Sequence, residues 1–236
     1  MEKTDQLWPG GWQFLFDDQL FQPGTDSFLL GSFPHLKRGE KVCDLGAGTG
    51  LLGLLLLARE PSLHITNVEI QGAACDLARR TAALNGLESS ITCVEGDLRD
   101  TSLLKAGSFD TVIANPPYFA EGSGAKAENA ARRTARSEVT CTLEDVCQAA
   151  ARLLRWGGRF FLCLRPERMA ELMELCRRCG LEPKRLRLVR HRPDSPISLI
   201  LLACRRGGKP GLMIDELTLY HSDGTPTDDH NRIYHL

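Results

Sequence analysis

The chain has 236 residues, of which 42% are hydrophobic and 25% are charged, and its formal net charge is −1. These values are typical of a globular protein with enough apolar residues for one large core and a small appendage. The longest aliphatic stretch, within residues 51–58, is far shorter than the roughly 20 residues that cross a bilayer. Since the first residues also do not form a signal peptide, we expect a cytoplasmic protein without a membrane partner.

The nine cysteines are odd in number and scattered along the sequence. This distribution predicts small buried apolar side chains rather than a disulfide framework. Only Cys176 and Cys179 have the spacing of a Cys-x-x-Cys pair. No second pair and no histidine lies at zinc spacing from them, so we predict two neighbours on a helix and no metal site.

Charge is distributed unevenly along the chain. Residues 126–209 contain 19 Lys and Arg against 9 Asp and Glu, whereas the segments on either side are acidic. The basic segment could neutralise RNA phosphates, although solvated helix and strand faces would give the same excess. Its clustered cations are Arg132, Arg133 and Arg136, followed by Lys184, Arg185, Arg187, Arg190 and Arg192.

Two short elements are predicted before the first core strand. The apolar runs at residues 12–16 and 20–22 favour a hairpin. Residues 28–33 favour a short helix, which Thr25, Asp26 or Ser27 could cap.

The first core unit combines a strand, a glycine loop and a helix. Residues 41–45 favour a strand, Gly46, Gly48 and Gly50 follow it, and residues 51–59 favour a helix. Glycines in this place let a ligand approach the backbone at a helix N-terminus. Residues 48–53 also fit the dinucleotide pattern G-x-G-x-x-G, so an NAD-binding unit is an alternative. Asp44 favours a different ligand, because a carboxylate directly before the glycines would repel a pyrophosphate and attract a cation.

Three further predicted strands end in polar residues. Residues 64–68 lead to Glu69, where an acidic side chain can bind both ribose hydroxyls. Residues 91–94 precede Asp97, and residues 109–114 lead to Asn115. The carboxyl ends of parallel strands share one edge of a sheet, and ligands of open α/β folds bind at that edge. The sequence therefore predicts a single site there.

A rigid corner follows the strand at residues 109–114. Two consecutive prolines fix φ and end the strand, because proline has no N–H for the sheet. The asparagine before them can present its side-chain carbonyl beside the first proline's carbonyl, and two such acceptors suit a planar –NH₂ group. The two aromatic residues offer flat surfaces for a planar substrate. This corner is Asn115-Pro116-Pro117-Tyr118-Phe119.

The rest of the chain contains a loop and alternating elements. Residues 120–137 hold glycines, small residues and charges, and we interpret them as a mobile substrate loop. Residues 212–220 favour a last extended segment. Helices are predicted at 71–85, 143–155 and 166–179, a strand at 159–164, and a terminal hairpin at 186–189 and 197–204.

Several of these motifs occur together in known enzymes. Asp44 with its three glycines resembles the first motif of S-adenosylmethionine (SAM) dependent methyltransferases. With residues 24–27, the Asn-Pro-Pro-Tyr-Phe corner and Gly-Gly-Lys-Pro-Gly-Leu at residues 207–212, the whole chain resembles bacterial tRNA adenine-N6 methyltransferases that modify valine tRNA beside its anticodon. The glycine-lysine-proline motif is the most particular of these signals. One departure is Ser137, where the family pattern leads us to expect histidine.

The resemblance implies an α/β Rossmann-like class I methyltransferase fold. Its mostly parallel sheet would have seven strands, an antiparallel terminal hairpin and helices on both faces. We expect residues 1–35 to form a hairpin and helix appended to a methyltransferase domain at residues 36–236. The implied cofactor is SAM and the implied partner is tRNA. The cofactor-binding residues carried over are Thr25, Asp26, Asp44, Gly46, Gly48, Gly50, Glu69, Asp97 and Asn115. Of these, Asp97 would hold the amino group of the SAM adenine.

The predicted reaction is direct methyl transfer to the exocyclic amine of an adenine in tRNA. The catalytic residues would be Asn115 and Pro116, whose oxygens accept from the amine, and Tyr118, on which the base stacks. A protein glutamine N5-methyltransferase is an alternative, because a glutamine amide fits the same corner. A non-catalytic SAM- or RNA-binding module is another. The substrate-binding residues would be Pro117, Tyr118, Phe119, Arg132, Arg133 and Arg136.

Overall fold

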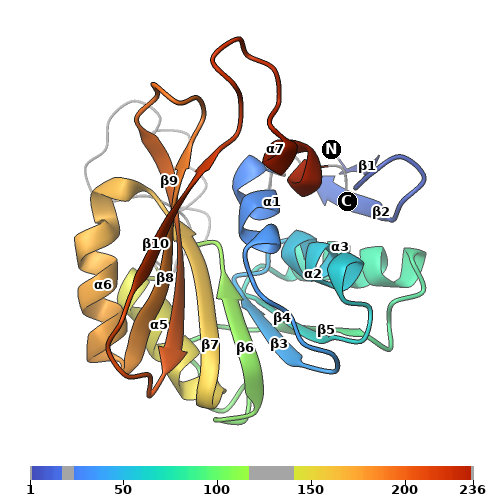
Figure 1. Cartoon of the computed structure of the whole chain (residues 1–236). Helices are drawn as coiled ribbons and strands as arrows, with labels where there is room; N and C mark the ends of the chain where they lie inside the picture. The colour runs from blue at the N-terminus through green and yellow to red at the C-terminus, as the bar shows by residue number, and fades with distance from the viewer. Residues whose placement is uncertain (1, 18–23, 117–140, 235–236) are drawn as a thin grey trace.

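The computed structural model describes residues 2–17, 24–116 and 141–234. Its centre is one eight-stranded sheet with helices on both faces (Figure 1). All neighbouring strands are parallel except β9, which runs antiparallel to β7 and β8. The order across the sheet is β10 (Met213–Thr218), β8 (Leu181–Arg190), β9 (Ile197–Arg206), β7 (Leu154–Leu164), β6 (Phe109–Ala114), β3 (Lys41–Leu45), β4 (His64–Glu69) and β5 (Ile91–Glu95).

The helices divide between the two faces of this sheet. The helices are α1 (Thr25–Ser32), α2 (Leu51–Arg59), α3 (Gly72–Leu84), α5 (Leu143–Leu153), α6 (Met169–Arg178) and α7 (Asp228–Tyr234). Helices α1 and α2 cover one face and α5 and α6 cover the other (Figure 1). No helix in the described ranges is long and apolar enough to cross a membrane.

Buried side chains alternate between the two faces along each central strand. Val42 and Ile113 pack in the core half beneath α1 and α2, whereas Cys43 and Val112 pack in the half beneath α5 and α6. A sheet buried on both faces needs such continuous apolar strands, because successive side chains point to opposite sides. The fold class predicted from the sequence is confirmed by this arrangement.

The structure corrects three details of the prediction. The sheet has an eighth strand, because the segment expected to be merely extended joins its edge as β10, parallel to β8. β7 begins at Leu154, directly after α5 and before its two glycines, with a register irregularity that accommodates them. At the N-terminus, β2 (Gln13–Asp17) pairs with the preceding β1 (Glu2–Gln6). Residues 20–22, the expected hairpin partner, lie outside the described residues.

The N-termini of two helices differ in how they are capped. α5 has a complete capping box, in which the Thr142 hydroxyl accepts from the Asp145 N–H at 3.1 Å and the Asp145 carboxylate accepts from the Thr142 N–H at 2.9 Å. The cap expected from Thr25, Asp26 or Ser27 is wrong, because α1 begins after Gly24 without a side-chain cap. Gly24 already has the extended backbone that the capping position requires.

Candidate active site

The glycine loop between β3 and α2 is built around left-handed backbone. Gly46, Gly48 and Gly50 have φ of 71°, 55° and 83°, values that side chains with a Cβ rarely adopt. The N–H groups of Gly46 and Ala47 donate to the Val68 carbonyl at 2.9 and 3.0 Å, which fixes the loop against β4. The loop therefore lies at the carboxyl edge of the sheet, and a Cβ at Gly46 would meet no atom within 4 Å.

Asp44 lies beneath this loop and is fully buried. Neither carboxylate oxygen has a hydrogen-bond partner among the described residues. Burial, and secondarily the charge of Glu69, raises the pKa of Asp44 to about 8. A buried carboxylate without a partner is costly to ionise. A cationic ligand nearby would relieve that cost, as the sequence suggested.

Glu69 follows β4 and is also buried. One of its oxygens accepts from the Gly48 N–H at 2.8 Å and the other from the Gln71 N–H at 2.8 Å. Each carboxylate oxygen keeps a second acceptor position, so the side chain can still accept from ligand hydroxyls. Ile70, the next residue, is 42% exposed, and its apolar side chain at this edge offers a surface to a flat ring.

Asp97 lies beyond β5 in a tight turn. Its carboxylate accepts from the Arg99 guanidinium at 2.6 to 3.0 Å and from the Arg99 N–H at 2.9 Å. The hydrogen bond from the Arg99 side chain holds the pKa of Asp97 below its ordinary value. The side chain lies at the predicted edge, and Arg99 is a partner that sequence spacing did not predict.

Asn115 lies beside the glycine loop. β6 is the parallel neighbour of β3, and Ala114 pairs with Leu45, so Asn115 and Gly46 follow adjacent positions in the sheet. The Asn115 amide donates to the Ser27 hydroxyl at 3.2 Å, and its side-chain oxygen accepts from the Cys163 thiol at 3.0 Å. Ser27 and Cys163 are both buried. The amide is thus held from α1 on one side and from β7 on the other.

The remaining predicted site residues fall into two groups. Thr25 and Asp26 occupy the first turn of α1, next to Ser27, and the Thr25 hydroxyl donates to the Asp26 carboxylate at 3.4 Å. Pro116 is buried directly after Asn115. Outside the described residues lie Pro117, Tyr118, Phe119, Arg132, Arg133, Arg136 and the loop at 120–137.

The clustered cations of β8 do not form one open surface. Arg185 and Arg187 share Asp215 of β10, donating to its two oxygens at 2.7 and 2.6 Å, and both guanidinium groups lie over the Phe33 ring. Arg190 lies 3.4 Å from Glu216. Two of the cations that could have neutralised phosphates, Arg185 and Arg187, are therefore paired with β10 instead.

The cysteine pair lies at the end of α6. Cys176 is buried, with its sulfur 3.9 Å from the Cys147 sulfur of α5. In the part of the chain that the structure describes, no group of three or more His, Cys, Asp or Glu side chains could hold a metal ion.

Comparison with known proteins places this geometry in a family. The methyltransferase small domain family matches residues 15–174. The chain belongs to that family. Family membership decides between the two interpretations of the glycine loop, in favour of a methyltransferase and against a dinucleotide enzyme.

Curated relatives cover most of the chain. A tRNA1(Val) (adenine(37)-N6)-methyltransferase of Porphyromonas gingivalis is 33% identical over 185 residues, 75% of this chain and 72% of the relative. One of Serratia proteamaculans is 30% identical over 212 residues, 89% of this chain and 80% of the relative. The resemblance inferred from the motifs is confirmed by these relatives.

Solved structures support the same fold. A predicted O-methyltransferase from Agrobacterium tumefaciens has a TM-score of 0.73 at 24% identity, covering 89% of this methyltransferase and 95% of that chain. The geranyl diphosphate C-methyltransferase of Streptomyces coelicolor, solved with S-adenosyl-L-homocysteine, has a TM-score of 0.57 at 13% identity. At such identities these structures support the fold alone.

Two contacts of the site were missed by sequence reasoning. Ser27 and Cys163 are 88 and 48 residues from Asn115, and no local spacing connects them. The available signals were weak: Ser27 adjoins the Thr25-Asp26 motif, and Cys163 lies on a predicted strand.

Proposed function

We propose that this chain transfers a methyl group from SAM to N6 of an adenine in tRNA. The observation that carries the proposal is the position of the Asn115–Pro116 corner at the strand directly beside the glycine loop. The relatives of Porphyromonas gingivalis and Serratia proteamaculans are named as enzymes of this activity. We further propose that the enzyme works in the cytoplasm, where its tRNA substrate is found.

The residues around the glycine loop fit SAM. The ligand has a sulfonium and an ammonium, and Asp44 is a buried carboxylate whose oxygens lack partners among the described residues. A Cβ at position 50 would lie 2.9 Å from the Asn67 amide and 3.2 Å from the Ala78 Cβ, so only glycine keeps the loop so close to its support. Glu69 would bind the ribose hydroxyls, and Asp97 the adenine amino group. Thr25 and Asp26 would contribute from α1.

When bound, SAM supplies a methyl group on a positively charged sulfur, and the protein's own task is to present the amine. The Asn115 side-chain oxygen and the Pro116 carbonyl would each accept one N6–H of the adenine. Accepting hydrogen bonds from both N6–H groups orients the nitrogen lone pair away from the corner, and the nitrogen, positively charged after methylation, would release one proton to solvent. A general base is unnecessary, because alignment of the nucleophile supplies most of the rate enhancement.

The base itself would be held by residues of the corner and the following loop. Tyr118 would stack on the adenine, with Pro117 and Phe119 forming the neighbouring walls. Arg132, Arg133 and Arg136 would bind phosphates of the tRNA. Residues 1–35, as a hairpin and helix appended to the domain at 36–236, would carry Ser27 to the amide of Asn115.

Labelled SAM tests the proposal against its alternatives. The enzyme is incubated with total tRNA in one reaction and with a protein extract in another, and incorporated label is counted. We expect label in tRNA. Label confined to protein would favour the glutamine N5-methyltransferase, and no label despite measurable SAM binding would indicate a non-catalytic module.

A further inference from the structure

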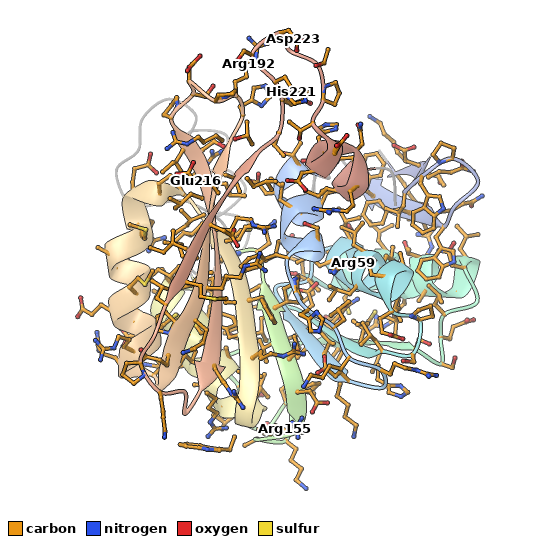
Figure 2. The ribbon with its side chains drawn as sticks, viewed as in Figure 1. Arg59, Arg155, Arg192, Glu216, His221 and Asp223 are labelled. Carbon is orange, nitrogen blue, oxygen red and sulfur yellow. The ribbon has the colours of Figure 1, made fainter. Side chains whose placement is uncertain are left out.

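Trp156 is the most exposed large hydrophobic side chain of the described residues, with 78% of its surface open to solvent. It lies near the start of β7, at the amino edge of the sheet, whereas Asn115 follows the carboxyl end of the neighbouring β6. Figure 2 shows the adjacent Arg155 at one end of the sheet and Arg192 at the other. β6 has six residues, so the two places are about 20 Å apart along the strands.

The Trp156 ring lies on the turn of the Gly-Gly-Lys-Pro-Gly motif. A Cβ at Gly207 would lie 2.2 Å from the ring, so only glycine permits this contact. Gly207 also has φ of 66°, and its N–H donates to the Gly180 carbonyl at 3.0 Å. The ring therefore rests close to the backbone of this turn, while 78% of the Trp156 surface stays open and can serve as a platform for a planar ligand.

Three cations surround this platform. Lys184, Arg205 and Lys209 line a hollow of about 440 Å³ together with Trp156 and the glycine turn. The Lys184 ammonium donates to the Lys209 carbonyl at 3.0 Å, and the Arg205 guanidinium lies 3.5 Å from a Cβ built at Gly157. None of the three cations forms an ion pair within the described ranges. Below, "the Trp156 hollow" means these four side chains and the turn at Gly207 and Gly208.

The acidic side chains nearby are engaged by other arginines. Asp110 lies 2.6 Å from Arg155, and Glu182 lies 3.5 Å from Arg177. The three cations of the hollow thus keep their positive charge, whereas in the middle of β8 Arg185 and Arg187 share the carboxylate of Asp215. An open indole face among cations is the arrangement that binds an unpaired nucleotide, through stacking on the base and pairing with its phosphates.

We propose that the Trp156 hollow is a second RNA-binding site, which holds an unpaired nucleotide of the tRNA at the sheet edge opposite the active site. This inference rests on the proposed tRNA substrate. It gives a role to the glycine-lysine-proline motif, whose position far from Asn115 leaves it without a part in methyl transfer. RNA fits better than an acidic peptide, because stacking on Trp156 uses the open aromatic face as well as the charges.

The test measures tRNA binding without catalysis. The dissociation constant of the full chain for total tRNA is determined at several salt concentrations, for wild type, Trp156→Ala, Trp156→Phe and Lys184→Ala/Lys209→Ala. Lys37→Ala, an exposed lysine in the loop before β3, is the charge control. SAM affinity and melting temperature, measured in parallel, report whether each variant is folded.

We expect Trp156→Ala and the double lysine variant each to weaken tRNA binding about tenfold, with Trp156→Phe close to wild type. The double lysine variant should also reduce the slope of log K against log[salt] by about one to two. Unchanged tRNA affinity in folded variants, which is the result expected if the hollow binds an acidic peptide, would overturn the inference. The same loss of affinity in Lys37→Ala would also overturn it. The identity of the methylated product is measured separately, so failure of the proposed reaction remains distinguishable.

Discussion

At the scale of single residues, the site depends on how the Asn115 amide is held. The amide contacts Ser27 of α1 and Cys163 of β7. The Cys163 thiol donates to the same side-chain oxygen that would accept an adenine N6–H, and so helps to orient it. Catalysis by alignment loses rate when the aligned group is loose. Cys163 is therefore expected to act as a positioning residue.

Substitution of Cys163 separates hydrogen bonding from packing. Cys163→Ala removes the donor and should lower kcat about three- to tenfold with little change in SAM affinity, since one hydrogen bond contributes roughly 1 kcal/mol. Cys163→Ser keeps a donor and should recover most of kcat. Cys204→Ala makes a comparable cavity in the other half of the core and should leave kcat unchanged. An equal loss of kcat in both alanine variants would assign Cys163 to packing alone.

Asp44 predicts a specific pH dependence. The pKa of Asp44 is raised from 3.8 to about 8 in the folded chain, so the folded chain binds this proton more tightly than the unfolded chain does. The stability that Asp44 contributes is complete below about pH 4 and is lost as pH rises through about 8. A bound cation lowers the pKa of Asp44 and releases this proton. Affinity for SAM should therefore increase between pH 6 and 8 and level off above.

Melting curves with and without SAM between pH 6 and 9 measure both effects. Asp44→Asn cannot ionise, so its SAM-induced shift in melting temperature should lose the rise between pH 6 and 8. A rise of the same size in wild type and Asp44→Asn would mean that another group titrates.

The chemistry of individual positions could be predicted from the sequence more readily than their contacts. The acidic residues and Asn115 lie at the carboxyl ends of their strands, as alternating strands and helices require. Arg99 on Asp97 and Cys163 on Asn115 were not predicted, because each depends on a side-chain conformation or on a partner far along the chain.

At the scale of secondary structure, the main difference from the prediction is that the extended segment at residues 212–220 joins the sheet as β10. Most of its side chains are exposed or half-buried, and Leu217 is buried, so its sequence lacks the apolar pattern of a core strand. Besides its backbone pairing with β8, it is attached through Asp215, which pairs with Arg185 and Arg187 of β8. Partial burial acts to raise the pKa of Asp215, but the two guanidinium groups hold it below its ordinary value.

Removal of this carboxylate should loosen the edge of the sheet. Asp215→Ala is expected to cost about 1 kcal/mol, because the pairs are partly exposed, and to leave two cations side by side. Hydrogen exchange of the amides in Met213–Thr218 should accelerate, whereas exchange in β3 and β6 should not. Glu216→Ala, which removes only a 3.4 Å contact with Arg190, is the matched control. Equal exchange in the two variants would show that backbone pairing alone holds β10.

The central strands were the easiest elements to predict. β3, β4, β5 and β6 are short apolar runs that end in glycine, proline or acidic residues. The predicted start of β7 was wrong, because two glycines usually end a helix and do not usually interrupt a strand. The predicted N-cap of α1 was wrong, because the three candidate capping residues follow Gly24, whose backbone already has the extended conformation of a capping position.

At the scale of the whole molecule, the proposed active site and the proposed second RNA-binding site lie at opposite edges of one sheet. The carboxyl edge brings together Asp44, Glu69, Asp97 and Asn115, and the amino edge carries the Trp156 hollow. The sequence predicted the first edge, because parallel strands bring their carboxyl ends to the same edge of a sheet. The second edge depends on the approach of residue 156 to residues 184 and 207, which only the folded sheet creates.

The most direct test of the account is nucleoside analysis of tRNA methylated in vitro. Wild-type enzyme and Asn115→Ala are incubated with SAM and unmodified tRNA, the RNA is digested, and methylated nucleosides are identified by mass spectrometry. We predict N6-methyladenosine with the wild type, and a rate lower by at least about a hundredfold with Asn115→Ala at unchanged SAM affinity. A different methylated nucleoside, or an Asn115→Ala variant that methylates as fast as wild type, would contradict the account.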